Sequence, residues 1–344
     1  MQELLGRIAA LDPGASLALR VIACFDELVV GNVNTRALLG AAASLSGCEV
    51  GFHQAATGAT MRVCPRGELT RDRDTPPPDA RPIADGLSVW LDREGVPHVN
   101  DEIILERLGL ALRIRHGRDR QDTDLRRNLG QLLDPGLPLA TRRQAATALG
   151  LHPGRRYRVV AAPLFAVWTE HPGGIEDVVA TPFGTIHASV VRADGPVGTA
   201  DPSGVGVAAE VDHLHTSFTT ALVALRLCER PATTTVSADD FGGLVSVLAS
   251  MPPDAEVPDV ELIDTVTGFP WGRATLDALV RAGTVRQAAR LAGVHHSTMQ
   301  SRVETVAGLL GFDPFDGLGR TRLGLAYLVW RLRHSRVLDL PAPT

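Results

Sequence analysis

Hydrophobic residues recur at helical spacing in the first part of the chain and then give way to short strand-like runs. Two helices are predicted, from Leu17 to Leu28 and from Asn34 to Leu45, because their apolar residues fall three or four positions apart. The runs that follow are bounded by turn residues and predict strands over 49–54, 60–64 and 87–91. Another helix is expected from Asn100 or Asp101 to about Gly117.

The middle of the chain repeats this mixture of helices and strands. Helices are expected over 124–133, 140–149 and 216–229, and strands over 157–162, 178–180, 185–191 and 205–211. Together they predict an α+β sandwich. Three prolines over 250–258 indicate an interdomain linker after it.

From Trp271 onward the apolar spacing predicts helices only, and two of them are joined by a very short connection. The join is Gly293-Val294-His295, with Ala289 four residues before the glycine. A small residue lets two helices cross closely, and a glycine tolerates the positive φ of a tight turn. The pattern therefore predicts a helix-turn-helix centred on 293–303.

The helix after this turn is predicted to direct polar side chains outward, as a helix in a DNA major groove does. Gln300 is suited to adenine, and Arg302 and Arg286 are suited to phosphates. The full set of DNA-contact candidates is His295, His296, Ser297, Thr298, Gln300, Ser301, Arg302 and Arg286. The alternative is the polar solvent face of an ordinary three-helix bundle.

Charge is unevenly distributed along the chain. The net charge is −5, but the stretch 271–336 holds ten arginines against four carboxylates, a formal charge of +6. A basic segment on an acidic body is typical of polyanion binding, although arginine-rich surfaces are often merely solvated.

Composition excludes several kinds of chemistry. The sequence contains no lysine, so P-loop nucleotide hydrolysis and lysine-imine catalysis are excluded. Hydrolase signatures are absent, and the four cysteines form no metal-binding pattern. His213 and His215 are close enough to suggest a metal site, but a helix starting at Thr216 or Ser217 is the simpler interpretation. We therefore expect a non-enzyme without a cofactor or metal, located in the cytoplasm and not bound to a membrane.

The C-terminal segment resembles that of PucR/CdaR-type transcriptional regulators. The matching residues are Thr275-Leu276, Gly283, Ala289, Val294-His295, Thr298 and Arg302-Val303. The family's usual Arg-Asn pair is His296-Ser297 here, and its later Arg and Tyr are Gln300 and Ser301. The resemblance is strong over 275–332 and weakens upstream, so site preference does not carry over from typical members.

The resemblance implies an α+β multidomain layout. Its parts are a GAF-like sensor or dimerisation domain (1–119), a degenerate GGDEF-like domain (120–250), a linker (251–270) and an all-α helix-turn-helix domain (271–344). The helix segment Ser217 to Ala221 fits the GGDEF-like pattern, whereas Phe241-Gly242-Gly243-Leu244 lacks the carboxylates of a working cyclase. In the GAF-like part Phe52, Arg62, Trp90 and His98 are the candidates to line a ligand pocket; a filled core is the alternative.

The function implied is sequence-specific regulation of transcription. The expected partners are double-stranded promoter DNA, a second copy in a homodimer or higher homo-oligomer, RNA polymerase and a small-molecule effector, with activation favoured over repression. Two alternatives stay open. One is a non-catalytic regulator whose basic C-terminal bundle binds an acidic protein, and the other is a nucleotide-acting enzyme that uses the middle domain.

Overall fold

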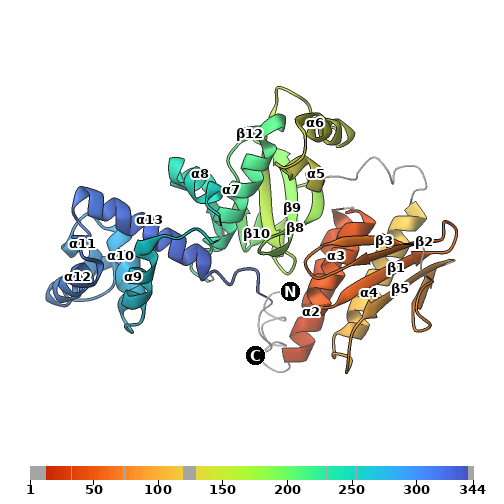
Figure 1. Ribbon diagram of the computed structural model, residues 1–344, viewed down its shortest axis with the longest axis horizontal. Helices are drawn as coiled ribbons and strands as arrows, with labels where there is room; N and C mark the ends of the chain where they lie inside the picture. The colour runs from red at the N-terminus through yellow and green to blue at the C-terminus, as the bar shows by residue number, and fades with distance from the viewer. Residues whose placement is uncertain are drawn as a thin grey trace. The chain divides into compact units, whose positions relative to one another are not determined.

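Two β-sheets, each packed against helices, precede a purely helical region (Figure 1). The structure is a computed structural model, and it describes residues 13–31, 33–72, 75–84, 86–118, 129–229, 231–252 and 254–339. The chain divides into two units, one formed by 1–249 with 336–344 and the other by 250–335. The predicted α+β character is confirmed, while the GAF-like and GGDEF-like assignments stay predictions.

The first unit begins with a five-stranded antiparallel sheet in the order β3-β2-β1-β5-β4. The strands are β1 (Glu49–Gln54), β2 (Ala59–Val63), β3 (Leu69–Asp72), β4 (Arg81–Ala84) and β5 (Leu87–Asp92). The helices are α2 (Pro13–Val30), α3 (Thr35–Ser46) and α4 (Asp101–Arg118). Their apolar stripes share one core with β1, β2 and β5, in which Phe25, Leu38, Phe52, Val89 and Leu108 are buried. The helices and strands predicted here are confirmed, and β3 and β4 are additional.

The same unit contains a second sheet, in the order β13-β11-β6-β9-β8. Its strands are β6 (Arg156–Pro163), β8 (Ile175–Thr181), β9 (Gly184–Arg192), β11 (Ser203–Val205) and β13 (Thr235–Ser237), with β12 (Ala209–Glu210) also paired to β6. A separate ribbon pairs β7 (Val167–Glu170) with β10 (Thr199–Asp201). The helices are α5 (Leu129–Leu133), α6 (Leu139–Ala148), α7 (Leu214–Arg226) and α8 (Gly243–Ser250), with short 3-10 turns η1 (Val211–His213) and η2 (Ala238–Phe241). Of these helices, α7 packs against β6 and β11.

The predicted strand over 205–211 is wrong in its middle, because the chain leaves the sheet between β11 and β12. Gly206 lies so close to α7 that a Cβ there would overlap the Ser217 carbonyl. The predicted start of the next helix is also wrong, since α7 begins at Leu214. The Ser217 hydroxyl is used inside the fold, where it accepts the Val159 N–H at 2.9 Å. His213 and His215 therefore lie in η1 and α7. The part of the predicted helix over 124–128 lies outside the described residues.

The second unit is a bundle of five helices within the described part of the chain. They are α9 (Pro258–Thr267), α10 (Gly272–Arg281), α11 (Val285–Leu291), α12 (His296–Leu310) and α13 (Gly317–Arg333). The predicted linker over 251–270 is corrected by α9, which buries Val260, Ile263 and Val266 against this bundle. Proline at its first position starts the helix, so the three prolines mark a helix boundary. No helix in the described ranges is both long and apolar enough to cross a membrane.

Candidate nucleic-acid interface

Helices α11 and α12 form the predicted helix-turn-helix, and each begins with a side-chain cap. At the start of α11, Thr284 Oγ1 accepts the Gln287 N–H at 3.2 Å, and Gln287 Oε1 accepts the Gly283 N–H at 2.9 Å. These bonds satisfy amide groups that a helix start leaves unpaired. At the start of α12, His295 Nδ1 accepts the Ser297 N–H at 3.4 Å. The His295 ring thus fixes where the second helix begins.

The turn between the two helices has the conformation expected from its glycine. Gly293 has a φ of 65°, and its N–H donates to the Arg290 carbonyl at 3.3 Å. The next N–H, of Val294, reaches back to the Ala289 carbonyl at 3.0 Å. This pair of bonds is the Schellman motif, which ends a helix and reverses the chain within a few residues. Ala289 is 4% exposed and α11 packs against α12, as the predicted close crossing requires.

The first turns of α12 separate a buried side from an exposed polar side. Met299 is fully buried, and Val306 and Leu310 continue the buried side of α12, which packs against α9 and α11. The exposed residues of this segment are His295, His296, Ser297, Thr298, Gln300 and Ser301. This arrangement presents hydroxyl, imidazole and carboxamide groups to whatever contacts the N-terminal half of α12.

Arg302, a predicted phosphate contact, is turned toward its own bundle. Its guanidinium lies 5.3 Å from the centre of the Trp271 ring, and Nη1 donates to Thr275 Oγ1 at 3.4 Å. Thr275 is fully buried on α10. The contacts of Arg302 therefore tie α12 to α10 and favour a positioning role.

Other arginines remain exposed beside the helix-turn-helix. Arg286 and Arg290 are exposed on α11, one turn apart, and Arg320 is exposed on α13 with its Nη1 close to Gly283. Among the residues that the structure describes, these three guanidiniums have no ion-pair partner. Sequence reasoning had singled out only Arg286. Arg290 lies four residues after Arg286, and this helical spacing could have indicated that the two share an exposed face. The position of Arg320 beside them depends on tertiary packing.

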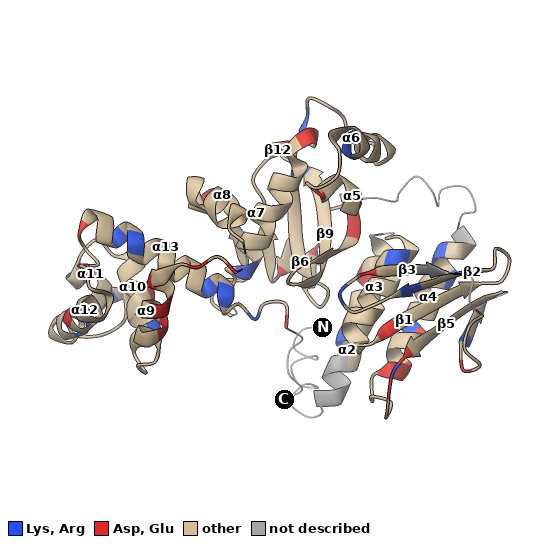
Figure 2. Cartoon of the chain, in the orientation of Figure 1, with Lys and Arg blue, Asp and Glu red and all other residues tan. Residues whose placement is uncertain are grey.

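Acidic residues of α9 offset the basic charge of this unit. Over 250–335 nine arginines face nine carboxylates, and several of the acids lie on α9 (Figure 2). Asp259 binds Arg322 through two hydrogen bonds of 3.0 and 2.7 Å, and this guanidinium lowers the pKa of Asp259. Asp264 accepts the Trp330 Nε1–H at 2.6 Å. Asp259 and Asp264 are therefore bonded to α13. They do not pair with the exposed arginines on α11 and at the start of α13.

The four residues predicted to line a ligand pocket in the first sheet do not converge. Phe52 is in the core, while Arg62 and Trp90 flank Gly51 on the opposite face, with the Arg62 guanidinium 5.4 Å from the Trp90 ring centre. His98 is exposed in the loop before α4. A cavity among α2, α3 and α4 measures about 10 Å³, so it has room for no more than about one water. None of the four predicted residues lines this cavity. A ligand site at these residues stays an unsupported prediction.

A buried polar cluster joins the second sheet of the first unit to α2 and the start of α3, and sequence reasoning missed it. The Glu176 carboxylate, 1% exposed, lies 2.9 Å from His171 Nδ1 and 2.9 Å from His187 Nε2. Glu27 on α2 lies 3.5 Å from His171. Nearby, the Asn34 amide, which also caps α3, donates to both oxygens of Asp177 on β8. Burial raises the pKa of Asp177 to about 7 and also raises the pKa of Glu27.

Comparison with known proteins bears on the helical unit. Residues 273–329 match the PucR C-terminal helix-turn-helix domain, which spans α10 to α13 almost completely. No curated protein matches the chain. A crystal structure of the regulator of polyketide synthase expression from Bifidobacterium adolescentis is similar at 14% identity, with 60% of this chain and 96% of that chain covered. Its TM-score of 0.26 is too low to establish a shared fold. The domain match supports a DNA-binding transcriptional regulator.

Proposed function

On the premise that residues 273–329 are a PucR-type helix-turn-helix domain, we propose that this protein regulates transcription by inserting α12 into the major groove of promoter DNA. The observation that carries the proposal is the exposed polar face of α12, which begins directly after the Gly293 turn and is flanked by exposed arginines. In this arrangement Gln300 reads a base edge, and Arg286, Arg290 and Arg320 contact phosphates.

The assembly that binds DNA is a homodimer or a higher homo-oligomer. One helix-turn-helix covers only a half-site, so two copies related by a two-fold axis match an inverted repeat. The protein acts without catalysis, as an activator that responds to a small molecule or partner through its first unit and engages RNA polymerase. The family resemblance supports this part of the proposal.

Binding of the full chain to the DNA upstream of its own gene tests the proposal. Fluorescence anisotropy, repeated from about 50 to 200 mM salt, is expected to give log affinity that falls linearly with log salt, because each phosphate contact releases counterions. Unlabelled DNA of unrelated sequence is expected to compete at least about a thousandfold more weakly. Equal competition by unrelated DNA would contradict sequence-specific regulation. Binding to acidic proteins but not to DNA would favour the alternative of a protein-interaction regulator.

A further inference from the structure

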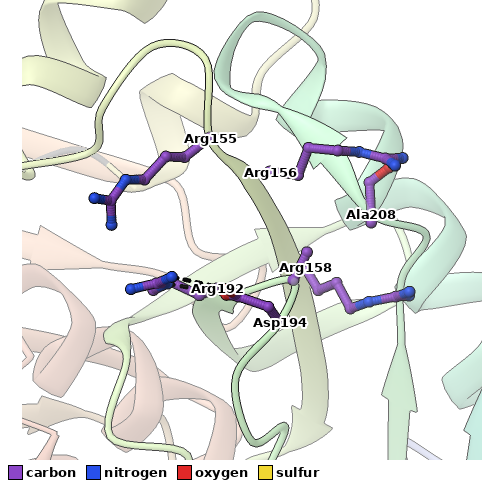
Figure 3. A pocket seen from close by; sticks show the side chains of 7 residues that line it. Arg155, Arg156, Arg158, Arg192, Asp194 and Ala208 are labelled. Carbon is purple, nitrogen blue, oxygen red and sulfur yellow. Dashed lines mark hydrogen bonds and ion pairs between the residues drawn. The ribbon is translucent and has the colours of Figure 1, made fainter.

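A surface pocket of the first unit is lined mainly by arginines. It has a volume of about 600 Å³ and lies where β6 begins and β9 ends (Figure 3). Its lining residues are Arg155, Arg156, Arg158, Arg192, Ala193, Asp194 and Ala208. The two alanines are its only hydrocarbon side chains apart from the arginine stems, so the pocket offers no apolar or aromatic bed for a ring system.

Two of the four guanidiniums are held in place by carboxylates. Arg192 binds Asp194 through two hydrogen bonds of 2.9 and 2.7 Å, and Arg158 forms an ion pair with Asp239 at 2.7 Å. Arg158 also donates to the Gly206 carbonyl at 2.8 Å. Fixed donors of this kind lose little side-chain entropy when they bind a ligand.

The other two guanidiniums form no ion pair within the described part of the chain, although Arg155 helps to lower the pKa of Asp194. Arg156 donates one N–H to the Ala208 carbonyl at 2.6 Å, and Arg155 is exposed just before β6. Counting Asp194, Asp239 and Glu210, which lies opposite Arg156 on β12, against the four arginines leaves a local charge of +1. This excess is notable because the region 129–249 holds eight arginines against eleven carboxylates.

The directions of the side chains limit what can fill the pocket. Figure 3 shows the guanidinium groups of Arg155 and Arg192 on one side of the strand and those of Arg156 and Arg158 on the other. A ligand that uses all four must therefore present two separate anionic groups. Guanidinium groups match phosphoryl oxygens through paired N–H donors, and the volume suits a small molecule.

We propose that this pocket binds a small anion carrying at least two phosphoryl groups, with one phosphoryl group between Arg155 and Arg192 and the other between Arg156 and Arg158. The site lies in the first unit and makes no use of the helix-turn-helix. It therefore supplies an effector site for the proposed regulator, but its existence does not depend on DNA binding.

Calorimetric titration of the full chain with inorganic pyrophosphate, without DNA and at constant ionic strength, tests this proposal. Saturable binding is expected, and the double variant Arg155→Ala/Arg156→Ala is expected to weaken it by about tenfold or more, because both guanidiniums without an ion-pair partner are lost. The matched control is Arg66→Ala/Arg113→Ala, which removes two exposed arginines from the first sheet's domain and is expected to change the dissociation constant by less than about twofold.

Three outcomes would overturn the proposal. They are the absence of saturable pyrophosphate binding, equal weakening in the control variant, and unaltered binding by the pocket variant. If pyrophosphate does not bind while Arg155→Ala/Arg156→Ala lowers affinity for DNA, the pocket is a nucleic-acid contact instead. Arg155 and Arg156 are exposed, so the variant is expected to unfold at the parent's melting temperature, which thermal unfolding verifies. Loss of DNA binding with pyrophosphate binding intact would refute the proposed function alone.

Discussion

The guanidinium of Arg302 lies 5.3 Å from the ring centre of Trp271, so an arginine of the helix proposed to contact DNA is directed toward its own bundle. Its hydrogen bond to the buried Thr275 strengthens the same link between α12 and α10. An arginine stacked on an aromatic ring positions α12 by packing as well as by charge. The distinction matters because removing a phosphate-contacting arginine changes how the affinity for DNA depends on salt, whereas removing a positioning arginine does not.

Arg302→Ala and Arg286→Ala are expected to affect DNA binding in different ways. Removing Arg286 deletes a phosphate contact and is expected to reduce the slope of log affinity against log salt by about 1. Removing Arg302 is expected to leave that slope unchanged while destabilising the second unit by roughly 1 kcal/mol through the lost contact with Trp271. Anisotropy across salt and denaturant unfolding measure the two effects. Equal changes of slope in both variants would return Arg302 to the DNA surface.

Gln300→Ala is expected to lower affinity for the specific site by roughly 1–3 kcal/mol and to relax the preference at one base pair, because a bidentate base contact is lost. Affinity for unrelated DNA is expected to stay the same. Thr305→Ala is the matched control, since Thr305 is also exposed on α12 but donates its hydroxyl to the Ser301 carbonyl at 3.0 Å. The measurement is the binding of the parent, Gln300→Ala and Thr305→Ala to a panel of DNA sites that differ by single base pairs. A uniform loss at all sequences would exclude base reading by Gln300.

Gly293→Ala is expected to destabilise the helix-turn-helix by roughly 1–2 kcal/mol, the cost of a left-handed backbone for a residue with a Cβ. Crowding does not contribute, because a Cβ at Gly293 would have no atom within 4 Å. Gly308→Ala on α12 is the control. It has equally open surroundings but lies at a helical position in the last turn of α12, so alanine is expected to stabilise the helix by up to about 0.5–1 kcal/mol. Thermal unfolding of both variants checks the opposite signs, and the same sign for both would refute this account of the turn.

Asp177→Asn is expected to remove a pH dependence from the stability of the first unit. Burial raises the pKa of Asp177 from 3.8 to about 7, despite the opposing charges of Arg36, His187 and Arg115. The folded state therefore holds this proton more tightly than the unfolded state, and its stability falls as pH rises from about 4 to 7. The asparagine variant is expected to match the parent near pH 4 and to exceed it at pH 8 by at least about 1 kcal/mol. A parent that is the more stable protein at pH 8 would contradict this prediction.

Local signals in the sequence predicted much of the fold. The caps at Asn34 and Thr284 and the glycine at 293 place helix ends through bonds within a few residues, so their positions can be inferred from a short window. The short strands β3, β4, β7, β10 and β13 were missed because pairing with distant strands, rather than their own residues, defines them. The break at Gly206 depends likewise on the approach of α7.

The candidate site could be predicted only in part, for a similar reason. Helical periodicity separates Met299 from the exposed Gln300, so the polar face follows from spacing alone. Periodicity does not report that Arg302 reaches Trp271, or that Arg320 lies near Gly283, because those residues are distant in the sequence. The acids of α9 likewise lie outside the basic stretch 271–336, because the prolines before them predict a linker instead of a helix of the bundle.

The central claim, that α12 reads promoter DNA, is tested most directly by comparing the parent with Gln300→Ala on the chain's own upstream DNA and on unrelated DNA at one salt concentration. The predicted result is a preference of the parent for the upstream DNA that Gln300→Ala reduces by about fivefold or more, with binding to unrelated DNA unchanged. Equal affinity of the parent for both DNAs, or a preference untouched by the substitution, would contradict the claim.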